Sequence, residues 1–204
     1  MYSPSIEILV NRIDDFNEKY AMVENEKAIF SIEYAEFHWD VSATAGVLSG
    51  NRYGLVRMAR DITLTAAASG NGGPSRECAS RFAEGSDGII ILKEKPALGM
   101  DGRARFGWDE PGLCRLPLDE RSYLEGILDS LGRAASASAE HEGEARIDWD
   151  GGNRAAFITG PERALLLLAS EIIRFTLSAS TGGRHEIKGL SGESGSLVLE
   201  LKEE

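Results

Sequence analysis

Apolar residues near the start of the chain recur at helical spacing. They follow one face of an α-helix, and two serines shortly before them are suitable N-terminal caps. A second set stands in the same relation after Pro117 and Asp119. The two sets are Ile6, Leu9, Val10, Ile13 and Phe16, and Leu124, Ile127, Leu128 and Leu131. The pattern therefore predicts two amphipathic helices, one in each half of the chain.

Alternation between apolar and polar residues follows each predicted helix and indicates strands with one buried face. The inward positions are Phe30, Ile32 and Tyr34 running on to Phe37, Trp39 and Val41, and later Ala145, Ile147 and Trp149. A short apolar strand, a hydroxyl-Gly turn and a second helix come next in each half. Two further strands are expected to close each half, at 77–81 and 89–93 and at 185–188 and 197–201.

The two halves also share residues at a constant spacing of 110 positions, which holds without a gap from Trp39 to Gly73. Nine pairs are identical, whereas average residue usage would give about two. They are Trp39/Trp149, Asp40/Asp150, Ala45/Ala155, Gly50/Gly160, Leu55/Leu165, Ala59/Ala169, Ile62/Ile172, Gly72/Gly182 and Gly73/Gly183. We interpret this as a tandem duplication of an α-β-β-α-β-β unit.

The order of elements predicts an α+β fold, namely a two-layer sandwich of mainly antiparallel sheet with helices on one face. The expected domains are a first repeat at 1–95 and a second at 117–204. The segment 96–116 between them is rich in Gly and Pro and has no counterpart, so it is a linker or a docked insert. Its aromatic residues Phe106 and Trp108 either pin it to the body or bind a partner. Whether the two repeats share one sheet is open at this point.

Composition narrows the class of partner. The formal net charge is −11, which argues against nucleic acid or an anionic membrane as the main partner and permits a basic protein. No apolar run approaches the length that spans a bilayer, and the first residues do not resemble a signal peptide. Cys78 and Cys114 are the two cysteines and form no C-x-x-C pair, so we expect a cytoplasmic protein without a disulfide framework.

Candidate chemistry in the sequence is sparse. The three histidines, His38, His141 and His185, have no metal-ligand spacing, and no nucleophile or phosphate-loop motif occurs. We therefore assign no catalytic residue, metal or cofactor. Asp40 and Asp150 could meet as a catalytic pair, or each could begin the turn after its strand. The second reading is preferred because both aspartates follow a strand-end tryptophan.

Acidic residues concentrate before and within the strand near Trp149. Carboxylates two positions apart point the same way along a strand, which predicts an acidic stripe of Glu140, Glu142, Glu144 and Asp148. Such a stripe either protects a strand edge from pairing with other chains or docks a basic partner. We take these four residues, with Phe106 and Trp108, as candidate partner-binding residues.

The run I-T-G-P-E-R-A-L-L-L-L-A-S-E-I, together with S-G-S-L-V-L-E-L, resembles small bacterial immunity-protein-like domains of polymorphic toxin systems. The first half matches more loosely through L-S-G-N-R-Y-G-L-V-R-M-A-R-D-I and G-S-D-G-I-I-I-L. The resemblance covers about half the chain, rests on turn and core residues and transfers no site residue.

Three hypotheses about function follow. The preferred one is a non-enzymatic acidic binding protein, of the immunity or adaptor kind, that engages a basic protein partner. The second is a structural subunit of a bacterial or phage assembly. The third is an enzyme with a site between the two repeats that includes Asp40, Asp150 and His38.

Overall fold

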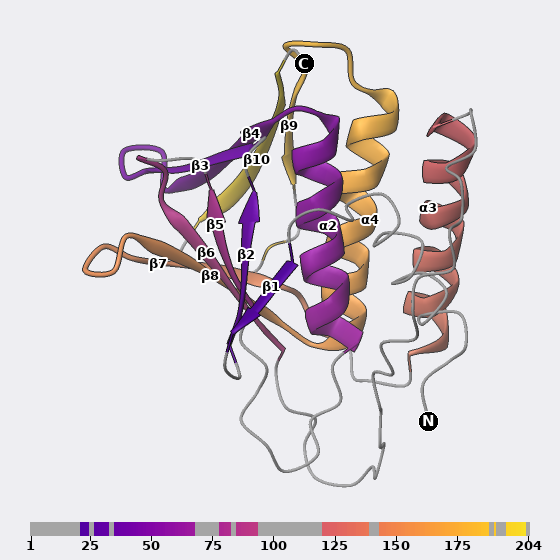
Figure 1. The fold of residues 1–204 in the computed structure, drawn as a ribbon, viewed down its shortest axis with the longest axis horizontal. Coiled ribbons are helices and arrows are strands. Elements are labelled where there is room, and N and C mark those ends of the chain that lie inside the picture. Colours follow the sequence, from indigo (N-terminus) through magenta and orange to yellow (C-terminus); the bar gives the residue numbers. More distant parts are fainter. Residues whose placement is uncertain are drawn as a thin grey trace, which may run out of the picture.

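The computed structural model describes residues 21–24, 27–32, 35–67, 78–82, 85–93, 120–138, 143–187, 190 and 195–202. Within them the chain is a mixed α and β protein with two sheets and three helices (Figure 1). The helices are α2 (Arg52–Ala67), α3 (Glu120–Ala137) and α4 (Glu162–Ser178). The strands are β1 (Ala21–Glu24), β2 (Lys27–Ile32), β3 (Ala35–Asp40), β4 (Ala45–Gly50), β5 (Cys78–Phe82), β6 (Gly88–Lys93), β7 (Arg146–Asp150), β8 (Ala155–Gly160), β9 (Arg184–Ile187) and β10 (Ser196–Leu201).

The coarse prediction of mixed helices and strands is confirmed, and the finer details differ. The alternating stretch from Phe30 to Val41 is two strands, β2 and β3, which belong to different sheets. Along β3 the alternation holds for Ala35 and Phe37, which are buried, but the predicted inward position Val41 is wrong, because it lies in the turn after β3 and is 75% exposed. The helix predicted near the amino terminus and the segment 96–116 lie outside the described residues.

Both sheets are mixed. One has six strands in the order β1-β2-β5-β6-β8-β7, and the other has four in the order β3-β4-β10-β9. Five of the eight described strand pairs are antiparallel, while β2–β5, β6–β8 and β4–β10 are parallel. Sequence periodicity anticipated hairpins but not these parallel pairs, because parallel strands are joined through distant parts of the chain.

Two of the parallel pairs connect the early and late parts of the chain. Strand β4 pairs with β10 over six residues, from Ala45 with Ser196 to Gly50 with Leu201. Strand β6 pairs with β8 in the same way, from Gly88 with Ala155 onwards. The ranges 1–95 and 117–204 therefore each contribute strands to both sheets.

Helices α2 and α4 lie side by side on one face of the sheets (Figure 1). Helix α3 packs against α4, so that α4 lies between strands β8 and β10 and α3. This position explains why buried residues cover most of the circumference of α4. Four of its large aliphatic side chains are fully buried, each worth about 1.5–3 kcal/mol of burial, namely Leu165, Leu166, Ile172 and Ile173.

Equivalent elements occur at the 110-residue spacing. Strands β4 and β8 begin and end 110 positions apart, and helices α2 and α4 begin 110 positions apart. Thr44 and Arg154, which end the loops before β4 and β8, have positive φ angles of 51° and 50°. Trp39 and Trp149, from β3 and β7, stack on one another with ring centroids 5.3 Å apart and planes 1° from parallel.

Because β4 pairs with β10 and β6 pairs with β8, we predict that the two halves of the chain fold stably only together. Among the described strands, fragment 117–204 would retain the hairpins β7–β8 and β9–β10 without their parallel neighbours, and fragment 1–95 would lose the neighbours of β4 and β6. Isolated hairpins are marginal in water. We expect the co-expressed fragments to co-purify one to one and to unfold cooperatively, as measured by circular dichroism. Cooperative unfolding of fragment 117–204 alone, as a monomer, would contradict the exchanged pairing.

A second prediction concerns Gly195, which precedes β10 with φ +145°. A Cβ there would lie 2.4 Å from the Thr44 carbonyl oxygen and 2.7 Å from Cη2 of Trp39. We expect Gly195→Ala to lower the free energy of unfolding by about 2 kcal/mol or more in urea titration. The control Gly132→Ala adds the same methyl group to open space on α3 and should raise stability by up to about 1 kcal/mol. Equal effects of both substitutions would refute the assigned contact.

Candidate functional site

The two aspartates that could have formed a catalytic pair each organise a hairpin turn. Oδ1 of Asp40 accepts hydrogen bonds from the backbone N–H and the hydroxyl of Ser42, at 2.9 and 2.6 Å. Oδ1 of Asp150 accepts from the backbone N–H of Gly152 at 2.9 Å, and its Oδ2 accepts from the Asn153 side-chain amide at 2.6 Å. Both carboxylates thus bond to the loop that follows their strand, and the predicted turn role is confirmed.

These bonds also set the ionisation of the two carboxyls. The Ser42 hydroxyl and the backbone N–H groups of the turn lower the pKa of Asp40 below its usual value. The Asn153 side chain and the turn N–H groups lower the pKa of Asp150 likewise. A general acid at neutral pH needs a raised pKa, so these environments shift both groups in the opposite direction.

Asp87 connects the two turns, and the sequence analysis did not single it out. Its Oδ2 accepts the backbone N–H of Trp39 at 2.9 Å. Its Oδ1 accepts two nitrogens of the Arg154 guanidinium, at 2.9 and 2.7 Å. Its own N–H donates to the Phe37 carbonyl at 2.8 Å. Asp87 is buried, and its neighbours in G-S-D-G made it resemble an ordinary turn residue.

The described part of the predicted acidic stripe lies on β7 and just before it. Glu144 and Asp148 are exposed, while Ala145 and Ile147 between them are buried, as alternation requires. Arg146 lies between the two carboxylates on the same exposed face, so this part of the stripe carries a positive charge as well. The candidates Glu140, Glu142, Phe106 and Trp108 lie outside the described residues.

Strand β7 is the edge of the six-stranded sheet, because it pairs with β8 on one side and ends the strand order. Its outward carboxylates therefore lie on a strand that has no second partner among the described strands. Asp150, half-buried at the end of the same strand, adds a third carboxylate to Asp148 and the flanking Glu144. The structure thus brings Glu144, Asp148 and Asp150 into one edge and hairpin.

The described histidines are separated. His38 is exposed on β3, with Nε2 at 4.0 Å from a Glu36 carboxylate oxygen. His185 is exposed on β9 and stacks on the Phe175 ring of α4, with centroids 5.9 Å apart. His141 lies outside the described residues, as does Cys114.

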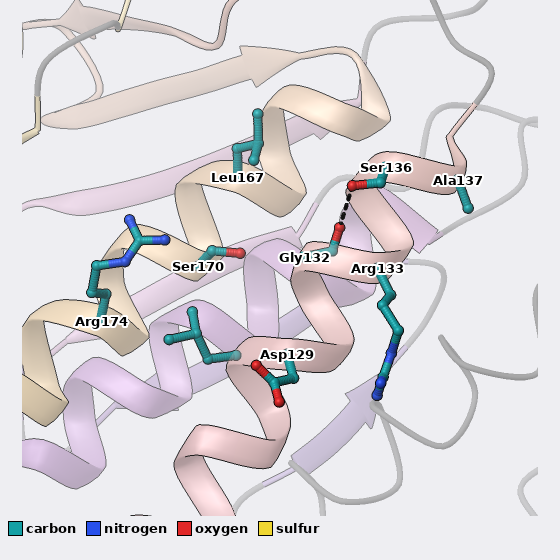
Figure 2. Close-up of a pocket in the computed structure, with 9 residues that line it drawn as sticks. Asp129, Gly132, Arg133, Ser136, Ala137, Leu167, Ser170 and Arg174 are labelled. Carbon is teal, nitrogen blue, oxygen red and sulfur yellow. Dashed lines mark hydrogen bonds between the residues drawn. The ribbon is translucent and has the colours of Figure 1, made fainter.

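An open groove of about 790 Å³ lies between α3 and α4 (Figure 2). Sequence patterns gave no sign of it, because it forms where two helices from different parts of the chain meet. Arg174 and Arg133 stand on opposite sides of the groove in this view, and Leu167 lies on α4. The lining residues are Leu128, Asp129, Gly132, Arg133, Ser136, Ala137, Leu167, Ser170 and Arg174.

Comparisons with known proteins returned no match to a protein-family model, to a curated protein or to a solved structure. Among the residues that the structure describes, no group of three or more His, Cys, Asp or Glu side chains is placed to hold a metal ion. None of the described helices combines the length and apolarity needed to cross a bilayer.

The lowered pKa values predict a specific acid response. The pKa of each carboxyl is lower in the folded protein than its unfolded value of about 3.8. Each carboxyl therefore stabilises the fold at pH values above about 3.8, and this contribution is lost as the pH falls through the folded pKa. Asp40→Asn/Asp150→Asn keeps an acceptor oxygen in each turn and removes both ionisations. We expect the variant to lose less stability than the wild type between pH 5 and about pH 2.

The measurement is urea unfolding across that pH range, with NMR titration of the two carboxyls in the wild type. Glu186→Gln removes one exposed charge from edge strand β9 and serves as the control. A titration in which either Asp40 or Asp150 has a raised pKa would revive the catalytic pair.

Proposed function

We propose that this chain is a non-enzymatic binding protein, of the immunity or adaptor kind, that engages a basic protein partner. The observation that carries the proposal is the position of β7 at a sheet edge with Glu144 and Asp148 exposed. The formal net charge of −11 surrounds this edge with a field that attracts cations. We also propose that the protein acts in the cytoplasm.

Electrostatic attraction would act mainly on the rate of association. Complementary charges steer a partner during diffusion and exclude partners of like charge. Asp150 contributes a further negative charge, because its carboxyl, whose pKa the turn hydrogen bonds lower, is ionised near neutral pH. Arg146, on the same face as Glu144 and Asp148, would select a partner with an acidic group between two basic ones.

The finer fold proposal is that the chain is a tandem duplication of a unit similar to the immunity-protein-like domains. The 110-residue spacing of β4 and β8 and of α2 and α4 supports it. So do the equivalent Asp40 and Asp150 turns and the paired tryptophans. In the duplication, β3, β4, β5 and β6 of the first unit correspond to β7, β8, β9 and β10 of the second. Replacing each strand by its counterpart turns the order β5-β6-β8-β7 into β9-β10-β4-β3, which is the order of the other sheet. Two related units about an approximate twofold axis are expected to show this relation.

The alternatives predict different behaviour. An exposed charged edge also prevents pairing with other chains, and this protective role needs no partner. A structural subunit would form discrete higher oligomers, which light scattering detects. An enzyme using Asp40 and Asp150 would require carboxyls released from the turn bonds that hold them.

Charge reversal on β7 tests the binding proposal. A partner is first isolated from the native host with the wild-type chain, and its association rate constant is then measured with purified components. We expect Glu144→Lys/Asp148→Lys to lower the rate constant by about tenfold at low salt and to weaken its salt dependence.

Glu186→Lys, on edge strand β9 of the other sheet, is the control for the single variant Asp148→Lys, which changes the net charge equally, and it should change the rate by less than about twofold. Equal effects of the β7 and β9 variants would show that the partner responds to the net charge of the protein and not to the β7 edge. An unchanged rate for both would exclude the β7 edge as the docking surface, and a purely oligomeric chain without a partner would favour the structural-subunit alternative.

A further inference from the structure

The groove between α3 and α4 has a floor of small residues. A Cβ built on Gly132 meets no atom within 4 Å, so open space lies directly above the α3 backbone. The Ser170 hydroxyl on the α4 side is buried and donates to the Leu166 carbonyl at 2.9 Å. Since that buried polar group already has its partner, an occupant need not supply one. The floor residues are Gly132, Ser136, Ala137 and Ser170.

Leu167 gives the groove an apolar contact point. Its side chain is 48% exposed, and Val41, on the β3–β4 loop, is the other large hydrophobic residue exposed in the described part of the chain. A leucine of this kind on a groove wall can bury its remaining surface against one apolar side chain of a partner. Burial of a whole leucine contributes about 1.5–3 kcal/mol, which sets an upper bound for this contact.

Two of the three charged residues that line the groove are basic, although the whole chain is acidic. Arg133 of α3 and Arg174 of α4 line it together with a single carboxylate, Asp129, whereas the chain carries a formal charge of −11. Arg133 donates to the Ser130 hydroxyl at 3.3 Å, and Arg174 pairs with Glu171. Both arginines are exposed, so each can also meet a carboxylate from outside.

The arrangement of the two arginines favours an elongated occupant. In Figure 2 Arg174 and Arg133 extend on opposite sides of the groove rather than toward a common point. They do not form a cradle for one small anion. They instead suit a segment with an apolar ridge over Leu167 and carboxylates on both flanks. A nucleic-acid backbone fits poorly because of the acidity of the rest of the chain.

We propose that the α3–α4 groove binds an acidic amphipathic helix of a protein partner. The small floor allows the close approach that helix packing requires, and Leu167 contacts the apolar ridge of the helix. Arg133 and Arg174 pair with carboxylates on its two sides. This surface is separate from the β7 edge and would recognise a partner of the opposite charge.

The test uses the full-length protein and a synthetic helical peptide of about four turns. The peptide carries leucines along one face and glutamates on both flanks, and fluorescence anisotropy measures its Kd. We expect saturable binding that weakens as salt increases. Arg133→Glu/Arg174→Glu should weaken it by at least about tenfold, and Leu167→Ser by about threefold or more.

Matched controls keep the result interpretable. Arg121→Glu reverses an exposed arginine of the same helix α3 that does not line the groove, and it should change Kd by less than about twofold. Glu144→Lys/Asp148→Lys should also leave the peptide affinity within about twofold, which separates this proposal from the β7 proposal. Thermal unfolding checks that each variant remains folded.

Three outcomes would overturn the proposal. The first is no saturable binding of the glutamate-flanked peptide to the wild type. The second is equal affinity for a lysine-flanked version of the peptide. The third is equal affinity for a single-stranded oligothymidylate, which would make the groove a general anion patch. Reversed preference of Arg133→Glu/Arg174→Glu for the lysine-flanked peptide would support it strongly.

Discussion

The parallel pairings of β4 with β10 and of β6 with β8 are the constraint on which the rest of the structure depends. Each joins strands more than sixty residues apart over a full six-residue register. Each places one hairpin from the early part of the chain beside one from the late part. Helices α2 and α4 can then share one face, because the strands they cover already belong to the same two sheets. Each sheet therefore contains strands from both halves of the chain.

Asp87 and Gly195 stand at two junctions that make corresponding backbone hydrogen bonds through different chemistry. The N–H of Gly88 donates to the Arg154 carbonyl at 2.9 Å, and the N–H of Ser196 donates to the Thr44 carbonyl at 3.1 Å. At the first junction the preceding residue is a buried aspartate bonded to Trp39 and Arg154. At the second it is Gly195, where a side chain would strike Thr44. A buried carboxylate is tolerated only with partners, and the first junction supplies them.

Sequence periodicity predicted the helices and strands whose formation depends on residues close together in the chain. The helical spacing from Leu55 to Ile62 and from Leu165 to Ile172 predicted α2 and α4, and the short apolar runs predicted β4 and β8. Strand partners could not be predicted, since pairing across the insert depends on contacts that periodicity does not encode. For the same reason the split between β2 and β3 and the α3–α4 groove were missed. Arg146 is visible in the sequence, but the spacing of the carboxylates alone does not indicate that a positive charge lies between them.

The division between inward and outward residues bears on function. Counted 110 positions apart, β3 and β7 share their inward pattern: Ala35 with Ala145, Phe37 with Ile147 and Trp39 with Trp149. Their outward positions differ, with Glu36 and His38 on β3 against Arg146 and Asp148 on β7. Glu36 is held within the chain by Lys202 at 2.6 Å. Packing explains the shared inward residues, and turn hydrogen bonds explain Asp40 and Asp150. Any task that distinguishes the two strands must therefore be carried by the outward positions that differ.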